Sequence, residues 1–292
     1  MTLPEPENIQ GRIFRPVGRC IYCGSDGHGR GLRDEHIIPF SLGGKAVLPK
    51  ASCANCEKIT SYLDGYLARH VYYDYRLHAG APTRRPKDRP KTRRALIKFK
   101  DREEVREFEI GSHPFSTVVP FLGLPGILTG DEPQRGFKSG KAVHFYYVPP
   151  NFPETIGLPF GESAEVVGRR NMDLVTFARA LAKVGYCHLW TADPGPFDPL
   201  PTRELVLGQY PNAAYLVGGG EDEDTPPPEE NVKLMHWVTI RWEPLAGRDV
   251  LFAVIRLFAN AGTDEKGMPL YLVALGERRR DPGPFLQNGA DA

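Results

Sequence analysis

Two cysteine pairs, Cys20-Ile-Tyr-Cys23 and Ser52-Cys-Ala-Asn-Cys-Glu57, frame the most informative stretch of this sequence. The two Cys-x-x-Cys pairs are separated by 29 residues. Two such pairs can place four thiolates tetrahedrally around one Zn²⁺ ion. With no secretion signal in the sequence, we expect metal binding rather than disulfides. The pattern therefore predicts a structural zinc site formed by Cys20, Cys23, Cys53 and Cys56.

The residues between and after these pairs predict strand, turn, strand and helix in that order. Leu32 to Ile38 is typical of a short strand that Pro39 ends, Ser41-Leu-Gly-Gly44 of a turn, and Lys45 to Leu48 of a second strand. A helix is expected after Cys56. Its apolar positions recur at steps of three and four residues: Ile59, Tyr62, Leu63, Tyr66, Leu67 and His70. Helical periodicity places Glu57, Ser61 and Asp64 together on the opposite face.

The segment Asp34-Glu35-His36-Ile-Ile-Pro39 combines acidic residues with a histidine at the end of the first expected strand. Phosphodiester hydrolysis can use such a pair, because a histidine deprotonates water while a carboxylate binds a divalent cation. Strand alternation places Asp34 on the face of His36 and Glu35 on the other, so Asp34 is a reserve ligand. The alternative is that these are surface carboxylates beside a structural histidine.

With these motifs, residues 18–78 resemble the HNH endonuclease family, whose core is a ββα-metal (treble-clef) fold. The resemblance rests on the cysteine pairs, on Glu35-His36-Ile-Ile-Pro39 and on the turn Ser41-Leu-Gly-Gly44. It implies that His36 is the general base and that Glu35 and Glu57 bind a catalytic Mg²⁺ or Mn²⁺ ion. Asp64 is a candidate for a further ligand or for an orienting group. Leu48 stands where many members have an asparagine that orients the base, so either another group such as Ser52 or a backbone carbonyl orients His36, or the site is impaired.

A basic segment follows the expected helix, and it predicts contact with nucleic acid. Residues 1–100 carry 19 Lys and Arg against 9 Asp and Glu, whereas residues 101–292 carry 18 against 27. This asymmetry suggests that the first part binds a polyanion, or that the two parts neutralise each other. An extended arm is expected to grip the phosphate backbone, unless it is only a solvated linker. Its basic residues are Arg84, Arg85, Lys87, Arg89, Lys91, Arg93 and Arg94.

The fold class predicted for the whole chain is α+β. We expect the zinc-stabilised module at 1–78, the basic connector at 79–94, and a mixed α+β domain of unknown role at 95–292. In that last domain Asn171 is expected to cap a helix that ends near Trp190. Cys187 is expected to be a buried thiol in the core. Residues 221–231 are expected to form a surface loop. The strands are expected at 95–100, 105–110, 141–148, 232–242, 250–259 and 270–276.

The composition restricts the class of protein. Hydrophobic residues make up 41% and charged residues 25%, which is ordinary for a globular protein. No apolar run is long enough for a membrane span, so we expect a cytoplasmic protein that does not insert into membranes.

The sequence thus predicts a metal-dependent HNH-type endonuclease acting on DNA. RNA as an alternative substrate and assembly into a homodimer both stay open. One alternative is a non-catalytic zinc module that binds nucleic acid. Another is a sensor or interaction protein whose working part is residues 95–292.

Overall fold

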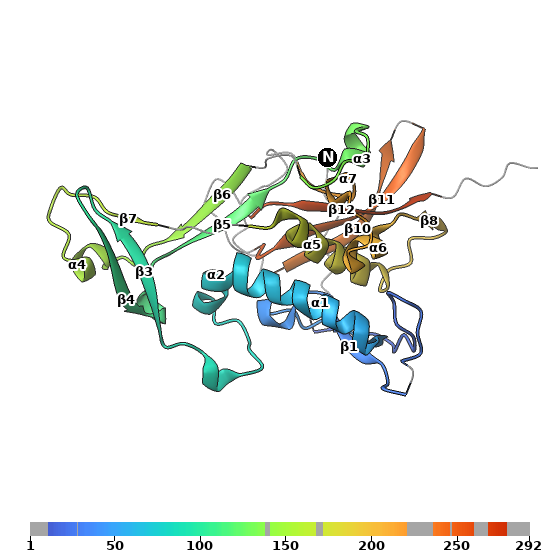
Figure 1. Cartoon of the computed structure of the whole chain (residues 1–292), viewed down its shortest axis with the longest axis horizontal. Helices are drawn as coiled ribbons and strands as arrows, with labels where there is room; N and C mark the ends of the chain where they lie inside the picture. The colour runs from blue at the N-terminus through green and yellow to red at the C-terminus, as the bar shows by residue number, and fades with distance from the viewer. Residues whose placement is uncertain are drawn as a thin grey trace, which may run out of the picture.

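The computed structural model describes residues 11–27, 29–137, 141–167, 172–220, 236–245, 247–259 and 268–278. The predicted cap Asn171 and the predicted loop 221–231 lie outside these ranges. The described chain is mixed α and β, as predicted (Figure 1).

The N-terminal part folds as a β-hairpin followed by helices. Strand β1 (Arg33–His36) pairs antiparallel with β2 (Val47–Ser52), and α1 (Ala54–Tyr66) follows. A π-helical turn, Leu67–Val71, links α1 to α2 (Tyr73–His78).

Two glycines make the predicted turn between β1 and β2 possible. Gly43 has a φ of 96°, which L side chains rarely adopt. A Cβ atom on Gly44 would lie 2.1 Å from the carbonyl oxygen of Ile38, so only glycine fits there.

The largest sheet is antiparallel and comes from the C-terminal half of the chain. Its strands run in the order β10 (His236–Leu245), β11 (Arg248–Leu257), β12 (Tyr271–Arg278) and β8 (Phe197–Pro199), and β9 (Val217–Gly219) also pairs with β12. The short helices α3 (Gly126–Thr129), α6 (Thr202–Leu207) and α7 (Ala213–Leu216) lie near this sheet (Figure 1).

A smaller lobe projects from the body at the left of Figure 1. It contains β3 (Thr92–Lys98), β4 (Glu103–Glu109), β7 (Glu165–Val166) and α4 (Phe152–Ile156). Its separate core includes Ile97, Phe108 and Phe152. A two-stranded ribbon, β5 (Phe115–Phe121) with β6 (Lys141–Tyr147), connects the lobe with the body.

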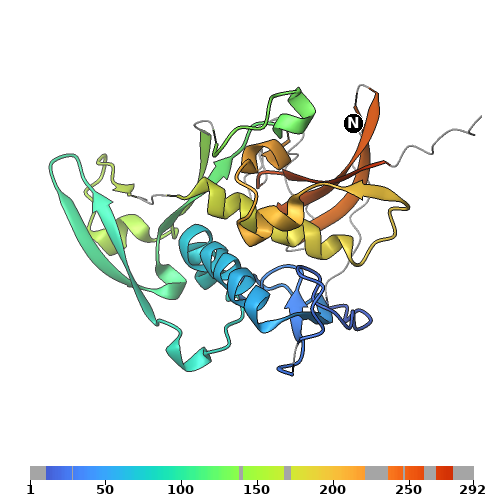
Figure 2. The ribbon, with the colours of Figure 1, turned by 45° about the vertical axis from the view of Figure 1, so that its right-hand side comes forward.

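Helix α5 (Leu174–Leu189) lies between the N-terminal hairpin–helix unit and the large sheet (Figures 1 and 2). It packs on α1 on one side and on β11 and β12 on the other. Every residue of α5 is buried or half-buried, which is the pattern of a helix surrounded by protein. One hydrophobic core contains side chains from the N-terminal hairpin–helix unit, such as Leu48 and Leu63, and from α5 and the large sheet, such as Leu181 and Val254.

Several local expectations need correction. Tyr62, predicted on the apolar face of α1, is 55% exposed, because Cys56, Thr60 and Leu63 are buried instead. The helix after residue 171 is capped by Asp173, whose carboxylate accepts hydrogen bonds from the backbone N–H groups of Val175 and Thr176. Strand β5 was not predicted, because Pro120 interrupts its apolar pattern.

The close approach of α5 to the sheet generates a prediction. A Cβ atom on Gly185 would lie 2.8 Å from Cβ of Ala253. Gly185→Val should therefore lower the free energy of unfolding by about 1–3 kcal/mol through overpacking, as urea denaturation would measure. Gly123→Val, at an exposed glycine with open space around it, is the matched control. Equal stability of the two variants would contradict this packing.

Candidate functional site

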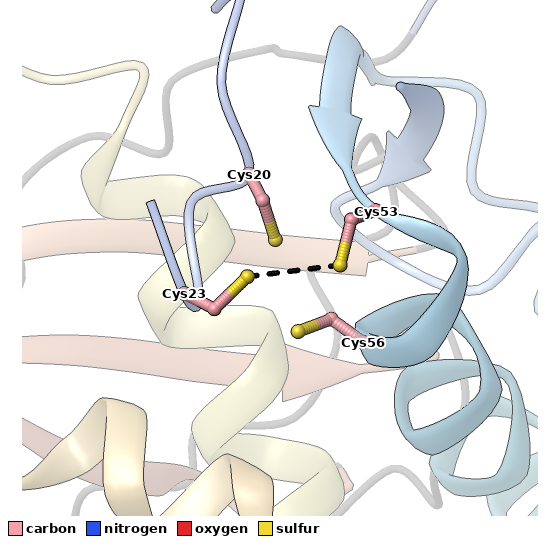
Figure 3. A group of neighbouring side chains, drawn as sticks. All are labelled: Cys20, Cys23, Cys53 and Cys56. Carbon is pink, nitrogen blue, oxygen red and sulfur yellow. Dashed lines mark hydrogen bonds between the residues drawn. The ribbon is translucent and has the colours of Figure 1, made fainter. Parts of the chain in front are cut away.

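The four predicted zinc ligands come together at the start of α1 (Figure 3). Cys20 and Cys23 lie in the loop before β1, Cys53 is the N-cap residue of α1, and Cys56 lies in its first turn. All four Sγ atoms lie within 4.8 Å of one another, and those of Cys23 and Cys53 are 3.6 Å apart. Four thiolates bound tetrahedrally at 2.3 Å would stand about 3.8 Å apart, so the cluster fits a zinc ion.

The environment of Cys53 favours its thiolate. Burial raises the pKa of this thiol, but hydrogen bonds from the backbone of Cys56, the Cys23 side chain and the backbone of Asn55 outweigh burial and lower the pKa to about 7. Zinc binds the thiolate form, which Cys53 reaches at a lower pH than Cys56 and Cys23, because burial raises the pKa of those two thiols.

His36 lies at the end of β1, on the wall of a pocket of about 560 Å³. Its ring is half-buried and meets the edge of Phe40 at a centroid distance of 5.7 Å. Burial lowers the pKa of His36, and the nearby cations Lys183 and Arg84 lower it further. The imidazole is therefore neutral near pH 7, which is the form that can accept a proton.

Arginines from two segments line the same pocket as His36. Arg69 follows α1, Arg76 lies on α2, and the connector contributes three more. The guanidinium of Arg69 folds back over Gly65, where a Cβ atom would lie 2.2 Å from it. The lining arginines are Arg69, Arg76, Arg84, Arg85 and Arg89.

Only part of the predicted basic arm faces this pocket. Lys87 and Lys91 are exposed. Arg93 forms an ion pair with Asp74 at 2.8 Å and lies over the ring of Tyr73. Because β3 begins at Thr92, Arg93 and Arg94 belong to a strand rather than to an extended arm.

The predicted ligand Glu35 is buried, and its partners are protein groups. One carboxylate oxygen lies 3.0 Å from Nζ of Lys183, a residue of α5, and the other accepts a hydrogen bond from the Thr60 hydroxyl at 3.2 Å. The side chain is 5% exposed. Glu35 therefore lies beneath the pocket rather than on its wall.

Asp64 pairs with the same lysine and also lines the pocket. Its Oδ1 atom lies 3.1 Å from Nζ of Lys183, and its side chain is 25% exposed. Burial raises the pKa of Asp64 to about 6, against the opposing attraction of Lys183. Asp64 is thus the predicted carboxylate ligand that shares the pocket with His36.

Glu57 and Asp34 have other partners. Glu57 forms an ion pair with Nε of Arg33 at 2.8 Å. Asp34 accepts a hydrogen bond from the backbone N–H of Lys50, which has a φ of 50° beside the irregular pairing of β1 with β2. Asp34 therefore stabilises the hairpin. The Ser52 hydroxyl donates to the carbonyl of Cys53, not to His36.

The carboxylates do not form a ready-made site for a divalent ion. Within the described ranges, the four cysteines are the only group of three or more His, Cys, Asp or Glu side chains close enough to share a metal. Glu35, Glu57 and Asp64 are each paired with a basic side chain of the protein instead.

Sequence reasoning missed Lys183, whose side chain is wholly buried. Its ammonium group donates a hydrogen bond to the backbone carbonyl of His36 and lies between Glu35 and Asp64. Although burial disfavours the charged form, these carboxylates raise the pKa of Lys183 above its usual value. A sequence signal existed, because a single lysine interrupts the apolar run Ala180-Leu-Ala-Lys-Val184.

A family model described as HNH endonuclease matches residues 20–72, the segment that contains the cysteine cluster, Glu35 and His36. We call this matched segment the HNH domain. Searches of curated proteins and of solved structures gave no match. None of the described helices combines the length and apolar character that crossing a membrane requires.

The cysteine cluster of the HNH domain generates a prediction about zinc. Cys56→Ser removes one of four thiolates, so zinc bound per chain, measured by elemental analysis, should fall well below one, and the melting temperature should fall with it. Cys187→Ala is the matched control, since this buried thiol contacts Tyr22 and lies outside the cluster. Equal zinc content in both variants would contradict the site.

Proposed function

We propose that this chain is an endonuclease that hydrolyses phosphodiester bonds in DNA, with His36 as the general base. The observation that carries the proposal is the position of His36 in a pocket lined by five arginines, within a segment that matches the HNH endonuclease family. A nuclease needs a proton acceptor and positive charge around the scissile phosphate, and this pocket has both.

The hairpin, α1 and the cysteine cluster correspond, in this proposal, to the ββα-metal (treble-clef) core. A zinc ion on the four thiolates would hold the loop before β1 against the first turn of α1. That connection sets the position of β1, and therefore of His36, relative to the helix.

The proposed reaction follows from the charges in the pocket. The neutral His36 imidazole takes a proton from a water molecule, and the resulting hydroxide attacks the phosphorus atom. The guanidinium groups of Arg84 and Arg85 bind phosphate oxygens and stabilise the negative charge that builds up on them. The leaving 3′ oxygen is then protonated by solvent.

A bound Mg²⁺ or Mn²⁺ ion would supply further charge stabilisation. That such an ion is required, and that Glu35 and Glu57 bind it, stay predictions. Both carboxylates would first have to leave their partners Lys183 and Arg33.

A second candidate function is nucleic-acid binding without cleavage. Two observations favour it: Leu48 is buried in the core where a base-orienting asparagine is common in the family, and the carboxylates are paired with protein cations. This alternative requires the zinc cluster and the arginines but not His36.

Replacement of the base tests the proposed function directly. His36→Ala should lower the rate of plasmid nicking in the presence of Mg²⁺ or Mn²⁺ by about 100-fold or more, because a general base contributes that much. The matched control is His144→Ala, since His144 is an exposed histidine on β6. If wild type and His36→Ala both bind DNA equally and neither cuts it, the non-cleaving alternative holds.

The arginines of the connector generate a separate prediction about binding. Each phosphate contact contributes about 0.9 to the slope of log affinity against log salt, so Arg84→Ala/Arg85→Ala should reduce that slope by about 1.8. Fluorescence anisotropy with duplex DNA at several salt concentrations measures it. The control Arg203→Ala/Arg278→Ala removes two half-exposed arginines from the C-terminal half. Equal slopes for the two double variants would count against the pocket as the DNA site.

A further inference from the structure

Lys183 lies where a cation shared by Glu35 and Asp64 would have to lie. Its Nζ atom is 3.0 Å from one Glu35 oxygen and 3.1 Å from one Asp64 oxygen. Glu35 lies on β1 and Asp64 lies on α1. The resemblance to the HNH family implies that a catalytic divalent ion binds between these two elements. The position between them is therefore taken by a protein ammonium group.

The hydrogen bonds of this ammonium group are fully used. A lysine ammonium has three N–H donors, and Lys183 has three acceptors: Glu35, Asp64 and the backbone carbonyl of His36. Its side chain is completely buried, so water cannot replace any of them. The third acceptor links the lysine to the main chain of the proposed base.

A divalent ion would not fit beside Lys183 in the same place. An ion that bridged Glu35 and Asp64 would stand within a few ångströms of the ammonium charge, and that repulsion is strong away from water. The Lys183 side chain is itself 0% exposed, in a helix that packs on α1 and on the large sheet.

We propose that Lys183 is a positioning residue of the HNH site, and that its ammonium group replaces a divalent ion between Glu35 and Asp64. Glu35 is then not a metal ligand. A divalent ion can bind only the side of Asp64 that faces the pocket, because that carboxylate is 25% exposed and keeps further lone pairs. This proposal depends on the proposed nuclease function in one respect: it treats the pocket that contains His36 as the active site.

The experiment measures Mn²⁺ binding, which does not depend on turnover. The full-length, zinc-loaded protein is titrated with Mn²⁺, and free Mn²⁺ is followed by its electron paramagnetic resonance signal. Asp64→Asn should weaken wild-type binding by about tenfold or more, whereas Glu35→Gln should change it by less than about twofold. Equal loss in both variants would make Glu35 a ligand and overturn the proposal.

Removing the lysine gives a second, opposite readout. Lys183→Met frees both carboxylates, so Mn²⁺ should bind about tenfold more tightly than to wild type, and adding Glu35→Gln should abolish that gain. Arg179→Met is the matched control, because Arg179 lies one turn earlier on α5 and donates to the carbonyls of Leu205 and Val206 instead. A folded Lys183→Met protein without the gain would overturn the proposal.

The results of these Mn²⁺ titrations can be distinguished from the result of the plasmid-nicking test of the proposed function. If Lys183→Met does not fold, the comparison of Glu35→Gln with Asp64→Asn decides the question with the lysine in place. If wild type binds no Mn²⁺ but Lys183→Met does, the lysine replaces the ion as proposed. Whether the protein cuts DNA is decided independently by the nicking assay with His36→Ala.

Discussion

The buried ion pairs of Lys183 join the two halves of the chain. Taking an ammonium group out of water is costly, and only well-placed opposite charges offset that cost. Here Glu35 and Asp64 supply those charges, so α5 can pack on α1 only if both carboxylates face it. The same contact holds the backbone of His36. The position of the candidate base thus depends on a residue 147 positions later in the chain.

Two clusters of side chains lie toward the two ends of α1 in the HNH domain. At the start of α1, four cysteines can surround one zinc ion. Toward the other end, Asp64 contacts the lysine of α5. Between these two points α1 packs against β1 and α5, and the pocket with His36 opens beside the connector arginines. This arrangement explains why residues 20–72 share one core with the C-terminal half although a family model matches them alone.

Local patterns predicted some features well because short-range geometry decides them. Cys-x-x-Cys spacing brings thiols together in any knuckle, and the cluster formed as expected. The helix after Cys56 and the long strands β10 to β12 also followed from periodicity, with boundaries that differ by a few residues. The prediction that Tyr62 is buried was wrong. Helix α1 packs on α5, and the face of α1 that this contact buries contains Thr60 instead of Tyr62.

The sequence by itself determined the four-cysteine cluster, the strand–turn–strand–helix order and the concentration of positive charge in the first 100 residues, because these depend on neighbours in the chain. Only the tertiary structure decided which acid meets which cation. Glu35, Glu57 and Asp64 have the same chemistry in the sequence, yet Lys183 pairs with two of them and Arg33 with the third. Electrostatic pairing acts through space and not along the chain. Lys183, which pairs with two of these carboxylates, lies on α5, and α5 is positioned by its packing on the large sheet.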